Sequence, residues 1–359
     1  MKATSIKQRV KAIQAELKKN KFNGLIITKP ANVTYATNFS GSDSWAIVTA
    51  GQVYLITDSR YTEQARKQCP HCKIINRTDS LAGAVGEILN KQKNIRIATV
   101  ENSTSIVNFQ ALKKTLKASL KTAKDIVETI RTIKDAEEIE LIKASAAIAA
   151  RALNMTLGQI KQGITENELA GILDLNIRKL GATNSFDTIV AFGSNASQPH
   201  YQPGSRKLKK HDTILIDFGA KYNNYCSDIT RCFVIGKPSP VYLKAYQAVK
   251  NAHDTAIKIV KAGVKAKDVD AVARKIIRQS NLPVYGHGTG HSFGIEIHEA
   301  PSLYPKSDCT LESGMVITIE PAIYIPGKLG IRIEDDILVT KNGCEILTQK
   351  CPHAPSLRL

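Results

Sequence analysis

The sequence predicts an α/β protein of two domains, residues 1–128 and 129–359. A length of 359 residues suits two globular domains. Strand and helix patterns alternate up to about residue 125, which indicates a small α/β domain. Asp135 and Glu138 then have the spacing of a capping box, and a strand-rich segment follows later in the chain.

Each element of the first domain has its own pattern. We expect an amphipathic helix over 6–19, a strand at GLIIT, and two strands in WAIVTAGQVYLIT around Ala50-Gly51. Further helices are expected over 59–69, 80–92 and 107–116, with strands at KIINR and IRIATVE between them.

The second domain is expected to open with a long helix over 135–157. Another helix pattern follows, then strands, and then helices over 241–262 and 269–281. A strand-rich segment ends the chain. Two hairpins contain acidic residues inside apolar runs, one before the helix over 241–262 and one in this last segment.

Composition limits the partners and the compartment. The net charge of +18 raises the question of nucleic-acid binding, but the basic residues are dispersed and no zinc-finger spacing occurs, so we expect no nucleic-acid partner. The N-terminus lacks the pattern of a signal peptide, no apolar run is long enough for a membrane helix, and seven scattered cysteines suit a reducing compartment. A cytoplasmic protein is therefore expected. The CPHC segment at 69–72 has no second cysteine pair for zinc and is interpreted as incidental thiols.

Two hairpins each place a pair of carboxylates on one face. If TILIDFGAKYNNYCSDITRCFVIG turns at Tyr222-Asn223, Asp217 lies directly opposite Asp228. If MVITIEPAIYIPGKLGIRIEDDILV turns at Gly327, Glu320 lies opposite Glu334. Like charges at that distance on a buried face need a shared proton, a basic partner or a cation. Four carboxylates with one imidazole suit two divalent ions, which can share a hydroxide nucleophile.

The segment GHGTGHSFGIEIHE supplies the histidines. His287 and His291 are four residues apart, but Gly288 and Gly290 disfavour the helix on which a zinc peptidase places such a pair. The following SFGIEIHE is expected to form a strand with a kink at Gly294.

Four of these segments, in this order, resemble the metal-dependent aminopeptidase P and prolidase family: LIDFGAKYNNYCSDITR, GHGTGHSFGIEIHE, ITIEPAIYIP and GIRIEDD. The resemblance implies an N-terminal creatinase/prolidase-type α/β domain and a C-terminal pita-bread catalytic domain. It also implies a homodimer that takes proline-containing peptides as substrates.

By the same resemblance, the metal ligands are Asp217, Asp228, His291, Glu320 and Glu334. They would hold two divalent ions, manganese first, with cobalt, zinc or iron as alternatives.

The resemblance also implies the catalytic groups His200, His298, Glu320 and Arg332. His298 would act on the tetrahedral intermediate, His200 would line the site, and Glu320 would assist proton transfer. Arg332 would support the ligands by pairing with Asp228, with Tyr324 as a further supporting candidate. His287 is interpreted as structural, and Glu299 has no chemical role.

The implied reaction is hydrolysis of an Xaa-Pro bond by a metallo-exopeptidase. Ser302 occupies the position where dipeptide-specific relatives often carry an arginine, which favours an Xaa-Pro aminopeptidase over a dipeptidase, although Lys306 could substitute. An Xaa-Pro dipeptidase, a methionine aminopeptidase and a non-catalytic binding protein of this fold remain as alternatives.

Overall fold

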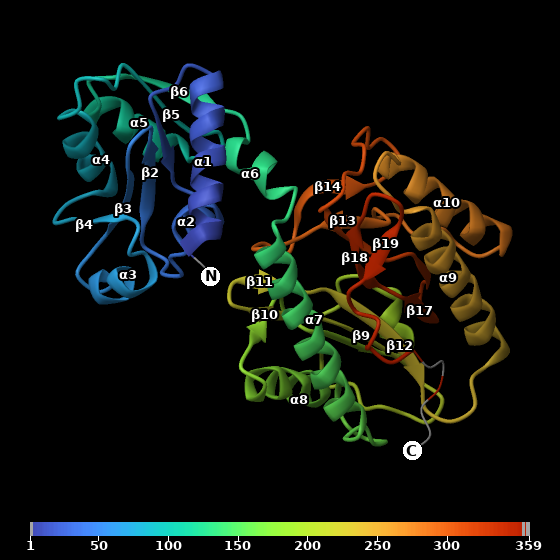
Figure 1. Cartoon of the computed structure of the whole chain (residues 1–359). Helices are drawn as coiled ribbons and strands as arrows, with labels where there is room; N and C mark the ends of the chain where they lie inside the picture. The colour runs from blue at the N-terminus through green and yellow to red at the C-terminus, as the bar shows by residue number, and fades with distance from the viewer. Residues whose placement is uncertain (1–2, 354–355, 357–359) are drawn as a thin grey trace. The chain divides into compact units, whose positions relative to one another are not determined.

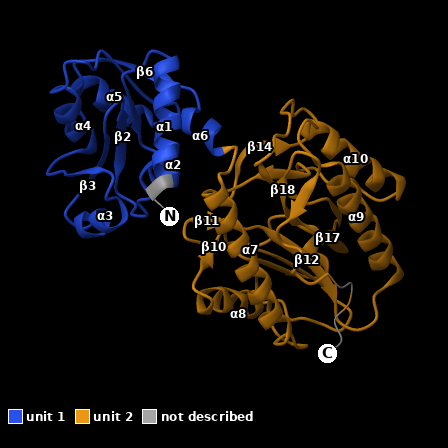
Figure 2. Cartoon of the chain, viewed as in Figure 1, with its two compact units in different colours: residues 1–131 blue, residues 132–359 orange. Residues whose placement is uncertain are grey.

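The computed structural model describes residues 3–353 and residue 356, and the chain divides into two compact units (Figure 1, Figure 2). Residues 1–131 form unit 1 and residues 132–359 form unit 2. The division lies three residues beyond the domain boundary expected from the sequence. Among the described residues, no helix combines the length and apolar character that crossing a bilayer requires.

Unit 1 is a twisted six-stranded sheet with helices on both faces (Figure 1). The strand order is β4-β3-β2-β1-β5-β6, and β1 pairs antiparallel with β2 but parallel with β5. The strands are β1 (Gly24–Ile27), β2 (Trp45–Thr49), β3 (Val53–Thr57), β4 (Lys73–Asn76), β5 (Ile97–Glu101) and β6 (Ser119–Ala123). The helices are α1 (Ala3–Lys19), α2 (Pro30–Thr37), α3 (Thr62–Gln68), α4 (Leu81–Leu89), α5 (Ile106–Thr115) and α6 (Ile126–Arg131).

The core of unit 1 follows the periodicity of its sequence. α1 buries Ile6, Val10, Ile13 and Leu17, which recur at helical spacing, and packs against α2 and α6. On the other face, α4 and α5 pack on apolar residues of β1, β2, β3 and β5. The elements α2, β6 and α6 were not expected from the sequence.

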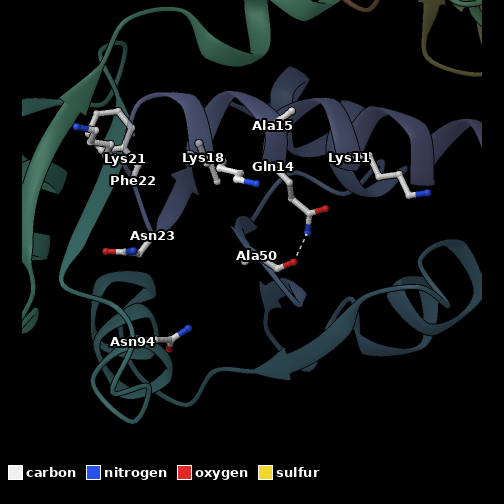
Figure 3. Close-up of a pocket in the computed structure, with 10 residues that line it drawn as sticks. Lys11, Gln14, Ala15, Lys18, Lys21, Phe22, Asn23, Ala50 and Asn94 are labelled. Atoms are coloured by element: carbon white, nitrogen blue, oxygen red, sulfur yellow. Dashed lines mark hydrogen bonds between the residues drawn. The ribbon is translucent and has the colours of Figure 1, made fainter.

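A hollow of about 600 Å³ lies beside α1 in unit 1 (Figure 3). Lys11, Lys18 and Lys21 line it, and Gln14 at its wall donates a hydrogen bond to the carbonyl of Ala50. Its lysines are exposed, and it contains none of the carboxylates or histidines predicted to act in catalysis, which all belong to unit 2.

Unit 2 packs two helix pairs on several short antiparallel sheets (Figure 1). Its helices are α7 (Ala136–Leu157), α8 (Glu166–Lys179), α9 (Pro240–Ile259), α10 (Ala266–Gln279) and the 3₁₀ helix η1 (Gly193–Ser197). Its first strands are β7 (Thr183–Asn184), β8 (Ile189–Phe192), β9 (Thr213–Phe218), β10 (Ala220–Tyr222), β11 (Tyr225–Cys226) and β12 (Ile229–Val234). The later strands are β13 (Gly290–Ser292), β14 (Glu299–Leu303), β15 (Val316–Ile319), β16 (Ala322–Ile325), β17 (Leu329–Arg332), β18 (Asp335–Val339) and β19 (Cys344–Ile346).

The predicted capping box begins α7. The Asp135 side chain accepts the amide of Glu138, and the Glu138 side chain accepts the amide of Asp135, so two free helix donors are satisfied. α7 and α8 share one apolar core with β8, β9 and β12, while α9 and α10 share another with β15, β16, β17 and β18. The sheets that carry the acidic residues are thus covered by helices from both cores.

Candidate metal centre and active site

The second hairpin has the predicted register. Pairs Ile319–Asp335 and Ala322–Arg332 flank Glu320 and Glu334, which therefore lie opposite each other. Gly327 is at the tip with φ of 69°, a conformation that favours glycine.

The first hairpin has a different register from the predicted one. The turn is at Asn223 and Asn224, which both have positive φ (47° and 74°), and Asp217 pairs with Thr230 rather than Asp228. Two consecutive positive φ values are typical of a two-residue hairpin turn, which asparagine tolerates. The shift is two residues, so Asp217 and Asp228 still face the same side.

The predicted strand over SFGIEIHE is wrong. Residues 293–298 form a loop between β13 and β14. The Glu299 carboxylate accepts a hydrogen bond from the amide of Glu296. The amide of Gly294 donates to the carbonyl of Glu296, and the backbone amide of Cys226 donates to the carbonyl of Gly294. These local bonds satisfy backbone groups that a strand would have paired with a neighbour.

His291 is placed on β13 beside the acidic residues. Its Nε2 lies 3.6 Å from Asp228 Oδ2 and 3.8 Å from Glu320 Oε1, while its Nδ1 is bonded to the carbonyl of Ser292. Gly290 allows this approach, because a Cβ there would clash with the carbonyl of Thr318 on β15. Burial, and then the neighbouring His298, lower the pKa of His291 to about 4. A neutral imidazole with one nitrogen anchored is what a metal ligand requires.

The carboxylates of this cluster repel one another. Burial, with the charges of Glu334 and Asp217 next, raises the pKa of Asp228 well above its usual range. Burial and Glu334 do the same for Glu320, and burial and Asp217 raise the pKa of Glu334 to about 8. Ligand atoms of Asp228, His291 and Glu334 lie within 4.8 Å of one another.

Asp217 supplies a further reason to expect a cation. Its Oδ1 is a buried atom that, within the described residues, accepts no hydrogen bond. Oxygen donors with one imidazole nitrogen suit a divalent ion of the manganese-to-zinc series. The residues present therefore fit the divalent ions that the sequence implies.

Arg332 pairs with Asp217 and not with Asp228, which corrects the sequence interpretation. Its Nη2 donates to Asp217 Oδ2 at 2.5 Å and its Nη1 to Tyr324 Oη at 2.6 Å. In the observed register Thr230 lies opposite Asp217, where Asp228 was expected, so Arg332 bonds Asp217 and Thr230.

Thr230 is a residue that the sequence analysis missed. Its hydroxyl donates to Glu334 Oε2 at 2.6 Å and accepts from Arg332 Nε at 3.0 Å. Thr230 follows Asp228 by two positions, so alternation along a strand could have placed it on the same face.

The next residue, Arg231, points to the other face of β12. Its guanidinium donates to the carbonyl of Glu334 at 2.5 Å, to Asp335 Oδ1 at 2.6 Å and to the carbonyl of Pro352 at 3.1 Å. Two consecutive residues of β12 therefore hold Glu334: Thr230 bonds its carboxylate and Arg231 bonds its backbone carbonyl.

A cavity of about 530 Å³ contains most of the predicted site. It is lined by Pro199, His200, Asp228, His287, Gly288, Gly290, His291, His298, Ser302, Tyr304, Glu320, Arg332 and Glu334. His298 lies edge-on to His291 with ring centroids 4.5 Å apart. His287 also reaches this cavity, where its Nε2 lies 3.1 Å from Tyr324 Oη.

We expect the metal-free protein to become less stable as the pH rises from 6 to 9. Glu334 has a pKa of about 8 when folded and an ordinary one when unfolded. The folded state therefore binds more protons across this interval, and its stability falls with pH. Thermal melting in chelator at each pH tests this. Excess manganese should remove the trend, and a melting temperature that rises with pH in chelator would contradict it.

Comparison with known proteins shows the family of the chain. Residues 140–341 match metallopeptidase family M24, and residues 9–133 match the creatinase/prolidase N-terminal domain. The chain is 34% identical over 352 residues to the Xaa-Pro dipeptidase of Pyrococcus furiosus, covering 96% of this chain and 98% of the relative.

Two solved structures have the same fold across almost the whole chain. An Xaa-Pro dipeptidase from Bacillus anthracis superposes with a TM-score of 0.93 at 34% identity, covering 98% of this chain and 100% of the other. An X-Pro aminopeptidase from Thermotoga maritima superposes with a TM-score of 0.90 at 35% identity, covering 97% and 100%. The chain belongs to metallopeptidase family M24, with a pita-bread catalytic domain preceded by a creatinase/prolidase N-terminal domain.

Proposed function

We propose that the protein is an Xaa-Pro dipeptidase. The observation that carries the proposal is a cluster of three buried carboxylates, the half-buried Glu320 and His291, beside a cavity that His200 and His298 also line. Full-length similarity to proteins named Xaa-Pro dipeptidase supports the substrate class. The preference for an aminopeptidase that Ser302 suggested has less support from these relatives.

Two divalent ions, manganese first, would be held by Asp217, Asp228, His291, Glu320 and Glu334. When bound, they would polarise the scissile carbonyl and supply a nucleophile at neutral pH.

The chain's own residues would position the substrate and move protons. His298 would donate to the carbonyl oxygen as charge develops there, with His200 on the same cavity wall. Glu320 would carry a proton to the leaving proline nitrogen. Arg332 would hold Asp217 in place, and Tyr324 would hold Arg332.

One observation favours an Xaa-Pro aminopeptidase as the second candidate. A dipeptide presents a carboxylate close to the scissile bond, which a cationic side chain would bind. Among the described residues that line the cavity, Arg332 is the one lysine or arginine, and it is already bonded to Asp217. Ser302 pairs with His291 across β13 and β14, so it lies at the wall where such a cation could act.

The two candidates are separated by assaying Ala-Pro and Ala-Pro-Ala side by side with the manganese-loaded protein. We expect a higher kcat/KM for the dipeptide. A preference for the tripeptide would replace the first candidate with the second. If neither peptide is cleaved by protein with bound metal, both candidates are wrong.

Replacing Ser302 with arginine is expected to move this ratio about fivefold to tenfold toward the dipeptide, the effect of about 1 kcal/mol. The added guanidinium would pair with the proline carboxylate, so the change should appear in KM. Ser302→Met, of similar length without charge, is the matched control. An equal shift in both variants would mean that residue 302 acts by shape and not by charge.

A further inference from the structure

A tight turn in unit 1 brings two cysteines together. Cys69-Pro70-His71-Cys72 connects α3 to β4, and the amide of Cys72 donates to the carbonyl of Cys69 at 2.9 Å. Such a four-residue turn holds its end Cα atoms within about 7 Å, and a disulfide needs about 4.4–6.8 Å. Pro70 at the second position favours the turn before any bond forms.

The neighbouring thiol of Cys69, and then burial, raise the pKa of Cys72. Both cysteines are free in this structure. Cys69 is fully buried, whereas Cys72 is partly exposed. Cys72 is therefore the cysteine that a reagent in solution would reach first, and Cys69 is the buried partner.

We propose that Cys69 and Cys72 are a thiol–disulfide exchange site, which forms a reversible intramolecular disulfide with small disulfides such as oxidised glutathione. This goes beyond the peptidase activity and revises the interpretation of the CPHC segment as incidental thiols.

The exchange balances in two steps. The Cys72 thiolate attacks one sulfur of the small disulfide, whose S–S bond breaks, and one small thiol leaves with the proton. The Cys69 thiolate then attacks the Cys72 sulfur of the mixed disulfide and displaces the second small thiol. The two cysteines lose two protons and two electrons, and the small disulfide gains them.

The expected exchange is slow at neutral pH. The thiolate is the attacking form, and the raised pKa of Cys72 keeps its thiolate fraction small. The rate should therefore rise about tenfold per pH unit while the thiolate remains the minor form. Once formed, the bond would tie the end of α3 to the start of the edge strand β4.

Peptide mapping of the full-length protein tests the proposal. The protein is incubated with oxidised and reduced glutathione at several ratios, acidified, unfolded, alkylated and cut with trypsin. Cleavage after Lys67 and Lys73 releases residues 68–73, a peptide whose cysteines are Cys69 and Cys72 alone. With oxidised glutathione we expect this peptide to lose two hydrogens and take no alkyl group, and after dithiothreitol to take two. Cys309 and Cys344, also partly exposed, serve as internal controls.

Single variants separate the roles of the two sulfurs. Cys69→Ser should stop at a glutathione adduct on Cys72, whereas Cys72→Ser should leave the buried Cys69 unmodified. A peptide that takes two alkyl groups at every glutathione ratio, or that carries glutathione instead of an internal bond at equilibrium, would overturn the proposal.

Discussion

Replacing Asp228 with asparagine should abolish peptidase activity and stabilise the metal-free protein. Asp228 is 5% exposed, and its pKa is raised first by burial and then by Glu334 and Asp217. An amide of the same shape removes one repelling charge, so the melting temperature in chelator should rise at pH 8. The same change removes a predicted metal ligand, so activity should fall by more than about 100-fold, the upper range for loss of a residue that only supports a ligand.

Three measurements separate the two effects: hydrolysis of Ala-Pro with manganese, bound metal per chain, and melting with and without chelator. Asp308→Asn is the matched control, because Asp308 is an exposed carboxylate paired with Lys267 and the change in charge is the same. Full metal content and activity in Asp228→Asn would remove Asp228 from the ligand set. A lower melting temperature in chelator would show that its charge is compensated in another way.

Replacing Arg332 with methionine should have the second large effect. Arg332 is 3% exposed and bonds Asp217, Tyr324 and Thr230 at once. Removing one partner of a buried ion pair typically costs about 3–5 kcal/mol, because the other charge stays buried. We expect the loss of stability in chelator to be greater at pH 9 than at pH 6, where the carboxylates can bind protons. Manganese should restore part of it, since the ions bring positive charge to the same carboxylates.

Activity with manganese should also fall in Arg332→Met, by about 10- to 100-fold, mainly in kcat, because Asp217 and Glu334 lose their orientation. Arg332→Lys is the comparison, since it keeps the charge but not the planar fork that bonds several partners. If lysine restores stability but not kcat, the fork is what catalysis requires. If methionine has wild-type kcat, Arg332 does not position the centre.

Periodicity and turn residues predicted which side chains of a strand lie on the same face, and this placed the carboxylates of the site together. The Gly327 turn gave the correct register for Glu320 and Glu334, because glycine is favoured at a positive φ. For Asp217 and Asp228 the turn was expected at Tyr222-Asn223, but it lies one residue later, at Asn223-Asn224. The register differs by two residues, and side chains alternate with a period of two, so Asp217 and Asp228 still lie on the same face.

The sequence does not predict which residues far apart in the chain bond one another. The partner of Arg332 depends on which strand lies beside β17, and the role of Thr230 depends on Glu334, which is 104 residues away. The loop at 293–298 has the alternation of a strand, yet bonds from Glu299 and Cys226 decide its course. In unit 1, α2, β6 and α6 were not expected: seven of the eight residues of α2 are buried, so it lacks an amphipathic pattern, and β6 has one buried residue.

Arg231 bonds the carbonyls of both Glu334 and Pro352, so we expect the carboxylate cluster and the segment around Pro352 to open together. If that segment opened, the buried Arg231 guanidinium would lose its hydrogen bond to the carbonyl of Pro352. Asp335 would also lose its contact with the His353 imidazole, at 3.3 Å. We therefore expect a ligand that stabilises the cluster to stabilise this segment as well. Local opening near Pro352 should therefore become rarer when a ligand occupies the carboxylate cluster.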